Sequence, residues 1–381
     1  MQRIYLDNAA TSPMHPDVIQ TMTEAMQDVF GNPSAVNYHG RQAKGLLEKS
    51  RQIMIDSLHG NQASEIIFTS GGTESDNTAI IQTAFKRQHL GKHLITTQIE
   101  HEAVLQAMAY LAENGFEITY LPVDKNGQIK LSDLQAALRD DTILVSIMAA
   151  NNEVGSVMPL AEIGQIVQPT NAWFHTDAVQ AYGVLPLDVN ACHIDLLSVS
   201  AHKIGGPKLL GFLYQRQGCE FGSYLKGGQQ EQKRRAGTQN VPAIAGFAKA
   251  VELVQEKQAQ QVEKYQNLKQ ILLATLVKQG VEFEVNGLYN QGELPQIINL
   301  WFKGCDSTKL LTNLDLAGIS VSAGSACSAG TLEASYVLQA MFADATRAHE
   351  SLRFSFGFAT TKTEVKQAAT TLSQIIKRIK K

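Results

Sequence analysis

Short apolar runs alternate with helical patterns over the first two thirds of the chain, and this alternation restricts the fold more than any other feature. The runs expected to be strands are 65–69, 93–97, 117–121, 143–148, 172–176, 194–199 and 209–214. Helical patterns lie between most of them, at 73–88, 102–113, 131–138 and 160–167. Strands that alternate with helices of this size predict βαβ units and a mostly parallel sheet, which is an α/β fold.

A second, smaller unit is expected after this alternating region, because 381 residues exceed the usual size of one domain. A helical pattern runs from Pro242 to about Gln279 and resembles a bridge between the two units. Strand-like runs follow at 281–285, 296–302 and 319–322. The sequence closes with an amphipathic helix that begins at a capping box, Thr361-x-x-Glu364.

Composition and charge exclude several classes of protein. The net charge of −3 gives no reason to expect direct nucleic-acid or membrane binding, and no apolar run reaches the ~18 residues of a membrane span. Four scattered cysteines without a CxxC pair indicate reduced thiols and a cytoplasmic protein. No His/Cys cluster has the spacing of metal ligands, so no metal is expected.

Polar residues follow several predicted strands, and the carboxyl ends of parallel strands are where such sheets bind ligands. The residues in these places are Thr73, His101, Asn152, Asp177 and Lys203. A lysine can form an imine, an acidic residue can hold a pyridinium N–H, a helix start can bind phosphate, and an imidazole can stack on a ring. Together these groups match the needs of pyridoxal 5'-phosphate (PLP).

Each position also has a structural interpretation when it is taken alone. Lys203 could be a solvated loop lysine, and Asp177 could be the N-cap of a helix. Gly71 and Gly72 suit an anion at a helix start, and they suit an ordinary tight turn equally well. A lone His101 is more simply structural. The agreement among the positions therefore carries the prediction.

Two further residues stand out in the second unit. Cys327 is surrounded by small residues, which predicts an exposed loop and an accessible, nucleophilic thiol. The other cysteines, Cys192, Cys219 and Cys305, are expected to be structural or incidental. Arg353 lies inside an apolar strand pattern, so it needs a buried anionic partner. A substrate carboxylate and an internal salt bridge both fit that need.

The chain resembles the IscS/NifS-type cysteine desulfurases of the class V aminotransferase group over nearly its full length. The matching segments are 5–11, 31–34, 69–77, 100–101, 151–153, 175–180, 200–203, 235–238, 324–327 and 352–355. In combination they are highly specific, and Gly324-Ser-Ala-Cys327 is typical of the group I, long-loop branch. The resemblance implies the PLP-dependent transferase fold type I. A large PLP-binding domain is expected at 16–258, with a mostly parallel seven-stranded sheet. A smaller α+β domain is expected at 1–15 and 259–381, carrying the catalytic Cys loop at about 320–335.

The resemblance also implies a role for individual residues. Lys203 forms the Schiff base with PLP, His101 stacks on its ring and is placed to act as an acid or base, and Cys327 accepts the sulfur. The cofactor-binding residues are then Gly72, Thr73, His101, Asn152, Asp177, Gln180, Ser200, His202, Lys203 and Thr238. Thr238 is expected to reach the phosphate of the neighbouring subunit, which implies a homodimer. The substrate-binding residues are Asn32, Asn152 and Arg353.

The implied reaction converts L-cysteine to L-alanine and leaves a persulfide on Cys327 that an acceptor protein collects. The chain stops soon after its last amphipathic helix, and with its segment 333–342 this compact form resembles short desulfurases of Gram-positive bacteria. Those enzymes are paired with a tRNA 2-thiouridylase, which is expected here in preference to an iron–sulfur scaffold. The sequence leaves open an aminotransferase or a selenocysteine lyase. It also leaves open a non-catalytic sulfur relay or tRNA-binding module, although Lys203 and Asp177 argue against a relay.

Overall fold

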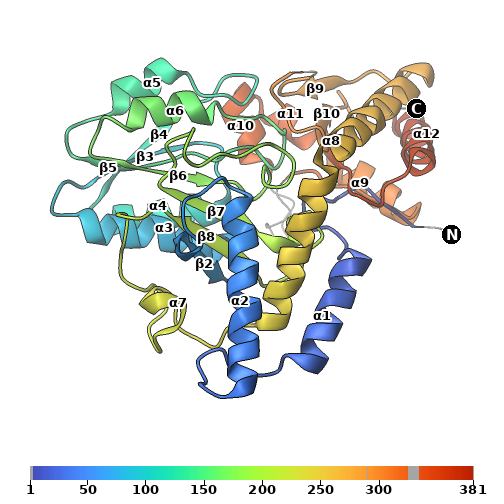
Figure 1. The fold of residues 1–381 in the computed structure, drawn as a ribbon. Coiled ribbons are helices and arrows are strands. Elements are labelled where there is room, and N and C mark those ends of the chain that lie inside the picture. Colours follow the sequence, from blue (N-terminus) through green and yellow to red (C-terminus); the bar gives the residue numbers. More distant parts are fainter. Residues whose placement is uncertain (1–2, 290, 325–333, 381) are drawn as a thin grey trace.

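The computed structural model describes residues 3–289, 291–324 and 334–380. A large α/β part and a smaller α+β part lie at either end of one long helix, α8 (Val241–Lys278), as Figure 1 shows. Pro242 stands in the first turn of this helix, and the Asn240 side chain caps it by accepting from the Ala243 N–H. The expected bridge between the two units is therefore present.

The large part is built on the expected sheet. Within the described residues it has seven strands in the order β2-β8-β7-β6-β5-β3-β4. Strand β8 is antiparallel to β2 and β7 on its two sides, and the other neighbouring pairs are parallel, so the sheet is mostly parallel as predicted. The strands are β2 (Ile66–Thr69), β3 (His93–Thr97), β4 (Glu117–Leu121), β5 (Thr142–Ser146), β6 (Trp173–Asp177), β7 (Leu196–Ser200) and β8 (Gly211–Gln215).

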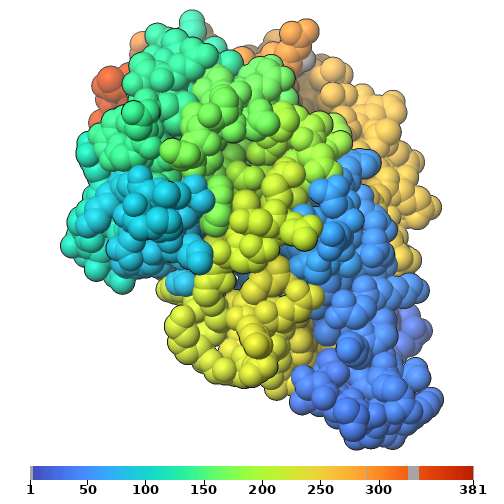
Figure 2. All heavy atoms as spheres, turned by 60° about the vertical axis from the view of Figure 1, so that its left-hand side comes forward, coloured from blue at the N-terminus to red at the C-terminus, as the bar shows by residue number. Residues whose placement is uncertain are grey.

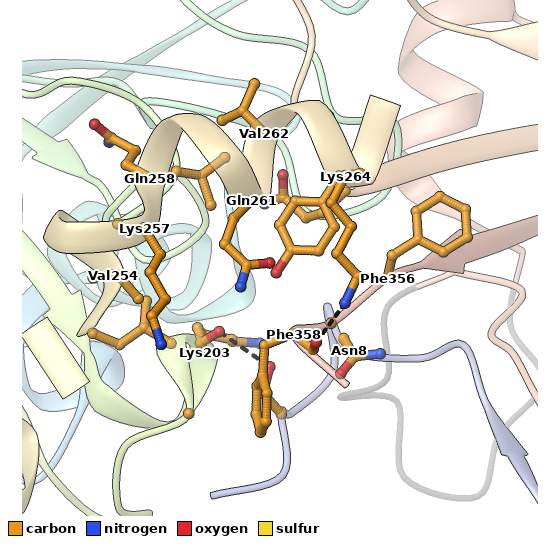
Figure 3. A pocket seen from close by; sticks show the side chains of 18 of the residues that line it. Asn8, Lys203, Val254, Lys257, Gln258, Gln261, Val262, Lys264, Phe356 and Phe358 are labelled. Carbon is orange, nitrogen blue, oxygen red and sulfur yellow. Dashed lines mark hydrogen bonds between the residues drawn. The ribbon is translucent and has the colours of Figure 1, made fainter. Parts of the chain in front are cut away.

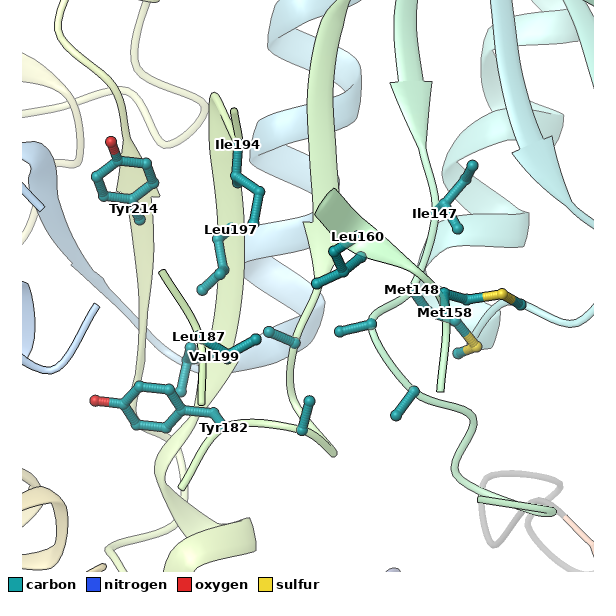
Figure 4. Packing of buried hydrophobic residues seen from close by; sticks show 14 of the residues in the cluster. Ile147, Met148, Met158, Leu160, Tyr182, Leu187, Ile194, Leu197, Val199 and Tyr214 are labelled. Carbon is teal, nitrogen blue, oxygen red and sulfur yellow. The ribbon is translucent and has the colours of Figure 1, made fainter. Parts of the chain in front are cut away.

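Helices cover both faces of this sheet because neighbouring residues of each strand point to opposite sides. Leu94 and Leu144 pack in one cluster with α3 and α4, whereas Ile95 and Val145 belong to the central core on the other face. Figure 4 shows part of that core, where Leu197 and Val199 of β7 lie near Tyr182. The helices of the large part are α1 (Pro16–Asp28), α2 (Tyr38–Asp56), α3 (Gly72–Arg87), α4 (Glu102–Glu113), α5 (Leu131–Ala137), α6 (Leu160–Val167) and α7 (Gln230–Lys233).

The smaller part has its own apolar core. Its sheet has the order β12-β10-β9, and β1 pairs in parallel with β11 beside it. The capping box at the start of α12 is present as predicted: Thr361 Oγ1 accepts from the Glu364 N–H, and the Glu364 carboxylate accepts from the Thr361 N–H. The elements are β1 (Ile4–Tyr5), β9 (Glu284–Asn286), β10 (Ile297–Trp301), α9 (Ser307–Leu316), β11 (Ile319–Ser320), α10 (Tyr336–Phe342), α11 (Ala345–His349), β12 (Ser351–Ser355) and α12 (Lys362–Ile379).

Several expected strands begin later than the sequence pattern indicates, and at two of them the backbone of a turn gives the reason. The run at 209–214 forms a strand only from Gly211, because Leu209 adopts a left-handed backbone (φ 54°) and is 86% exposed. The run at 281–285 forms a strand only from Glu284. The Val281 N–H donates to the Leu276 carbonyl across Gly280 (φ 70°), which is the Schellman motif that ends α8. In both places backbone geometry at a turn overrides the apolar pattern.

We propose that the chain divides into domains at 16–258 and at 1–15 with 259–381. The boundary falls within α8, whose N-terminal half contributes Ile244, Phe247 and Val251 to the central core. Its C-terminal half contributes Leu268 and other residues to the second core, which otherwise contains residues from 4–6 and 281–376. Helix α10 belongs to the second segment but packs on the central core, so the two parts are joined at more than α8. No helix in the described ranges combines the length and apolarity needed to cross a membrane.

Candidate active site

Ten of the residues that the sequence analysis singled out line one cavity of about 190 Å³ at the carboxyl ends of the parallel strands. They are Gly72, Thr73, His101, Asn152, Asp177, Gln180, Ser200, His202, Lys203 and Arg353. These residues come from different βα connections and, for Arg353, from the smaller part. Residues that lie up to 281 positions apart in sequence are therefore assembled at one edge of the sheet, as ligand sites in such folds are.

The start of α3 forms a cradle for an anion. Gly71 has a φ of 145°, which favours glycine, and it leads into the first turn at Gly72 and Thr73. A Cβ on Gly72 would lie 2.8 Å from a methyl group of Val179, so the close approach requires glycine. First-turn N–H groups have no partner within the helix, and the helix dipole favours negative charge there. This cradle continues into an adjoining pocket that Ser200 and His202 also line.

Lys203 lies in a short 3₁₀ turn, η2 (Ala201–Ile204), directly after β7. Its Nζ atom donates to the Ala9 carbonyl at 2.5 Å and to the Ala10 carbonyl at 3.0 Å. The Gln180 Nε2 atom donates to the same Ala9 carbonyl at 3.1 Å. Lys203 is therefore held by the N-terminal segment and is not a freely solvated loop lysine. These backbone carbonyls could not be predicted from the sequence, because no side-chain type marks which carbonyl will accept a hydrogen bond.

Asp177 is the last residue of β6 and is almost fully buried. Its Oδ1 atom accepts from the Val179 N–H at 2.8 Å in a turn, and no helix follows, so the alternative interpretation as a helix N-cap is wrong. Burial raises the pKa of this carboxyl, whereas His101 and Lys203 act in the opposite direction. A cationic N–H placed in the cavity would stabilise the ionised form of Asp177.

A buried polar layer lies beneath Asp177, and the sequence analysis did not identify it. Asp76 of α3 lines the cavity, and its Oδ1 atom has no hydrogen-bond partner in the described chain. His175 bridges Ser146 and Ser198 at 2.8 and 3.1 Å, and burial lowers its pKa to about 3, so this imidazole is neutral. The unsatisfied oxygen of Asp76 could have been suspected only because polar residues begin helix α3, which is otherwise buried.

His101 has a structural role in addition to lining the cavity. It is the N-cap of α4, and its Nδ1 atom accepts from the Ala103 N–H at 3.1 Å. This bond places the ring proton on Nε2 and fixes the plane of the ring. The structural interpretation of His101 is therefore correct, and it is compatible with a role in the cavity because the cap orients the imidazole.

Arg353 is the most deeply buried cation of the site, with 1% exposure. Its guanidinium donates to Asp7 Oδ1 at 2.8 Å and to the Asn152 carbonyl at 2.9 Å. The internal salt bridge that the sequence left open is thus present. Arg353 Nε and Asn152 Oδ1 have no partner among the described residues, although both are buried. The pair consequently retains hydrogen-bonding capacity for a ligand at the cavity.

Three predicted residues do not join this cavity in the described part of one chain. Thr238 and Asn32 are exposed and line other surfaces, with Asn32 in the loop between α1 and α2. Cys327 lies outside the described residues. The other cysteines, Cys192, Cys219 and Cys305, are unpaired, and burial raises the pKa of each thiol.

Comparison with known proteins agrees with the class that this fold and site define, an α/β transferase of the NifS-like kind. A solved structure described as a NifS-like protein superimposes with a TM-score of 0.92 at 34% identity, covering 99% of this chain and 100% of the other. A second, SspA in complex with cysteine, has a TM-score of 0.81 at 33% identity and covers 93% and 99% of the two chains.

Residues 4–368 match the aminotransferase class-V family model, and the chain belongs to this family. IscS 1 of Bacillus subtilis (strain 168) is 50% identical over 380 residues, which is 100% of both chains. The cysteine desulfurase IscS of Dictyoglomus turgidum is 42% identical and covers 100% of this chain and 96% of its own length. The resemblance to IscS/NifS-type proteins and the expected fold are thereby confirmed.

Proposed function

We propose that this protein is a PLP-dependent cysteine desulfurase that converts L-cysteine to L-alanine and transfers the sulfur to Cys327 as a persulfide. The observation that carries the proposal is the meeting of Lys203, Asp177, His101 and the start of α3 in one cavity. Relatives named as cysteine desulfurases over the full length, and the likeness to SspA in complex with cysteine, support the choice of reaction.

The residues present fit PLP. The α3 cradle suits its phosphate, and at Gly72 a Cβ would press on the side chain of Val179 beside this cradle. Asp177 would hold the pyridine nitrogen, and Gln180, which donates to the Ala9 carbonyl, would be the partner of the phenolic oxygen. The Oδ1 atom of Asp76 has no hydrogen-bond partner among the described residues, so a polar atom of the cavity lining is left unsatisfied. PLP, when bound, stabilises negative charge at the Cα atom of an amino acid.

The chain's own residues then divide the remaining work. Lys203 would hold the cofactor, and its Nζ atom would take the proton from the Cα atom of the substrate. Arg353 and Asn152 bind the substrate carboxylate, for which Arg353 Nε is the free donor. The Cys327 thiolate attacks the substrate sulfur, so that an S–S bond forms as the Cβ–S bond breaks. The electron pair stays on the carbon side, which protonation converts to L-alanine. His101 is placed to supply or remove a proton.

A homodimer is part of the proposal. Apolar side chains are exposed around the loop between α1 and α2, where Phe30, Val36 and Tyr38 stand out. Helix α2, which follows this loop, and the region around α7 lie side by side on one face in Figure 2, and Arg51 of α2 forms an ion pair with Glu231 of α7. Thr238 and Asn32 are exposed near these segments. A second chain seated there would let Thr238 reach the partner's phosphate cradle and bring Asn32 toward its substrate.

We further propose that the persulfide passes to an acceptor protein in a reducing, cytoplasmic setting. A tRNA 2-thiouridylase is the first candidate, because the segment 333–342 resembles the short desulfurases that serve such enzymes. An iron–sulfur scaffold is the alternative. Capture with the Cys327 persulfide trapped separates the two: recovery of a scaffold protein alone would contradict the tRNA-thiolation assignment.

The decisive experiment measures L-alanine and sulfide from L-cysteine and a reductant, with the visible spectrum of each protein. Wild type is expected to be yellow and active, and Cys327→Ala to be yellow but at least about 100-fold slower. Cys305→Ala serves as the matched control, since that thiol is buried in the second core. Equal alanine formation by Cys327→Ala would rule out Cys327 as the sulfur acceptor and favour a lyase or aminotransferase.

A further inference from the structure

A second and larger cavity, of about 610 Å³, lies where the two parts of the chain meet. The middle of α8 forms one wall, and the segment Phe356–Phe358 after β12 forms another, as Figure 3 shows. Lys203 and Gln180 line both this cavity and the candidate active site, so the two spaces share a wall. A volume of this size is typical of sites for small organic ligands.

Two buried hydrogen-bond acceptors in this cavity have no donor. Gln296 is only 9% exposed, and its Oε1 atom has no partner in the described chain, although its Nε2 atom donates to the Gln180 carbonyl at 3.4 Å. Gln261 Oε1 is buried in the same way and also lacks a partner there. Buried acceptors are almost always satisfied in folded proteins. The two unsatisfied acceptors therefore indicate that the cavity binds a molecule with hydrogen-bond donors.

The cavity also carries positive charge that the protein does not neutralise. Lys257 and Lys264 of α8 both line it, and no ion pair joins either of them to a carboxylate among the described residues. Two other lysines of the same helix are paired, Lys249 with Glu252 and Lys269 with Glu293, each at 3.4 Å. Lys257 and Lys264 differ from these two in lining the cavity without an ion pair in the described part of the chain, and an anion would be attracted there.

The surroundings of Lys264 are consistent with this charge. Its Nζ atom donates to the Phe358 carbonyl at 2.5 Å, which directs the ammonium group toward the cavity wall, as Figure 3 shows. Burial lowers the pKa of Lys264, and Glu364 partly offsets that effect. Glu364 is itself engaged in the capping box of α12, and the exposed Glu263 is the acidic residue on the lining. An anion in the cavity would restore the favourable environment that burial removes.

Apolar side chains complete the lining and favour an organic occupant over a simple inorganic ion. Val254 and Val262 of α8 and Phe356 and Phe358 of the opposite wall line it. The Phe358 ring is held against His15, with the two ring centroids 4.9 Å apart. Apolar walls with a few convergent polar groups are the usual form of a site for an organic molecule.

We propose that this cavity is a second ligand site for a small organic anion, a carboxylate or phosphate ester that also carries hydroxyl or amino donors. Its anionic group binds Lys257 and Lys264, and its donors reach Gln261 and Gln296. The site is separate from the proposed desulfurase chemistry and does not depend on it. Gln296, which such a ligand would reach, donates to the carbonyl of Gln180 in the shared wall.

Isothermal titration calorimetry on the PLP-loaded protein tests this proposal with two probes, citrate and glycerol 3-phosphate. Sulfate, an anion without donors, and glycerol, a donor without charge, are the ligand controls. At least one probe is expected to bind saturably at one site per chain. Binding of citrate alone would identify the ligand as a carboxylate, and binding of glycerol 3-phosphate alone would identify it as a phosphate ester. No binding by either probe up to about 10 mM, or equally tight binding of sulfate, would overturn the proposal.

Variants locate the binding. Lys257→Met, Lys264→Met and Gln261→Leu are each expected to weaken the probe by about tenfold or more. Lys249→Met is the matched control on the same helix, because Lys249 is paired outside the cavity, and it is expected to leave the affinity unchanged. Circular dichroism of each variant confirms folding, and Gln261 is only partly buried, so its variant keeps the test usable if a lysine variant unfolds. Affinity that survives all three cavity substitutions would place the probe elsewhere.

Discussion

Two buried arginines of this protein differ in what they leave unpaired. Arg51, which is 4% exposed, binds Glu231 through two nitrogens at 2.6 and 3.0 Å, and it also reaches Glu48 and the Ile66 carbonyl. Arg353 is buried just as deeply, but it makes single bonds to Asp7 and to the Asn152 carbonyl, and its Nε atom has no partner in the described chain.

The difference separates a saturated ion pair from one that keeps spare hydrogen-bonding capacity. Around Arg51 the partner is saturated too, since Glu231 also accepts from the Phe68 N–H and from Gln239. Nothing further can bind there, and the pair ties α2, β2 and the α7 region together. The unsaturated pair faces the cavity. A buried charge with spare donors is costly in an empty protein, so it indicates where a ligand of opposite charge belongs.

The largest expected effect is on stability, and it comes from breaking the saturated pair of Arg51 and Glu231. Arg51→Met leaves the Glu231 carboxylate buried without its cation and should lower the free energy of unfolding by roughly 3–5 kcal/mol. Urea unfolding followed by circular dichroism measures this change. Arg139→Met is the control, because Arg139 forms its ion pairs with Glu117 and Asp141 at the surface and should cost less than about 1 kcal/mol. Equal losses for the two variants would contradict the structural role of Arg51.

The unsaturated pair should respond in catalysis more than in stability. Arg353→Lys keeps the charge and loses the fork that can hold a carboxylate, so kcat/KM for L-cysteine should fall about 100-fold, or ~2.7 kcal/mol of transition-state stabilisation. Steady-state alanine production measures it, with the melting temperature as the check on folding. Unchanged kcat/KM would show that Arg353 is only a structural partner of Asp7.

Glu100 is a buried acid without a cationic partner among the described residues, and it should make the stability of the protein depend on pH. Burial raises the pKa of Glu100 from 4.5 to about 8, against hydrogen bonds from Thr97 and the Met148 N–H. Between these two pKa values the native state keeps a proton on Glu100 that the unfolded chain loses. The contribution of this proton to stability is complete below the unfolded pKa of 4.5 and is lost as the pH rises toward 8. Between pH 5 and 8 the unfolding free energy of wild type should fall at least ~1.4 kcal/mol more than that of Glu100→Gln. Parallel pH profiles would show that Glu100 ionises normally.

The smallest effect concerns the partner of Arg353. Asp7→Asn keeps a hydrogen-bond acceptor beside Arg353 and removes the negative charge that competes with a substrate carboxylate. KM for L-cysteine should fall by about two- to threefold while kcat stays within the same range. Initial-rate measurements decide this, with Asp17→Asn on the exposed start of α1 as the control. A rise in KM would mean that Asp7 positions Arg353 and does not compete for it.

Much of the fold and of the candidate site could be predicted because the signals are local. Strand and helix periods gave the mostly parallel sheet, and the strand ends gave Thr73, His101, Asp177 and Lys203. The strand starts that were predicted too early also have a local cause. Leu209 and Val281 have apolar side chains, but the backbone of Leu209 lies in a turn and that of Val281 lies in a helix cap. A periodic pattern does not report backbone conformation at such places.

The sequence by itself determined which elements form and which polar residues stand at the ends of strands, because both follow from side-chain period and from the geometry of parallel sheets. Only the tertiary structure decided the partners. Arg353 meets Asp7 across 346 positions, and Lys203 meets the Ala9 carbonyl across 194. Such contacts depend on how the two parts pack around α8, and no local pattern encodes that packing. The cavity beside Lys257 and Lys264 arises from the same packing.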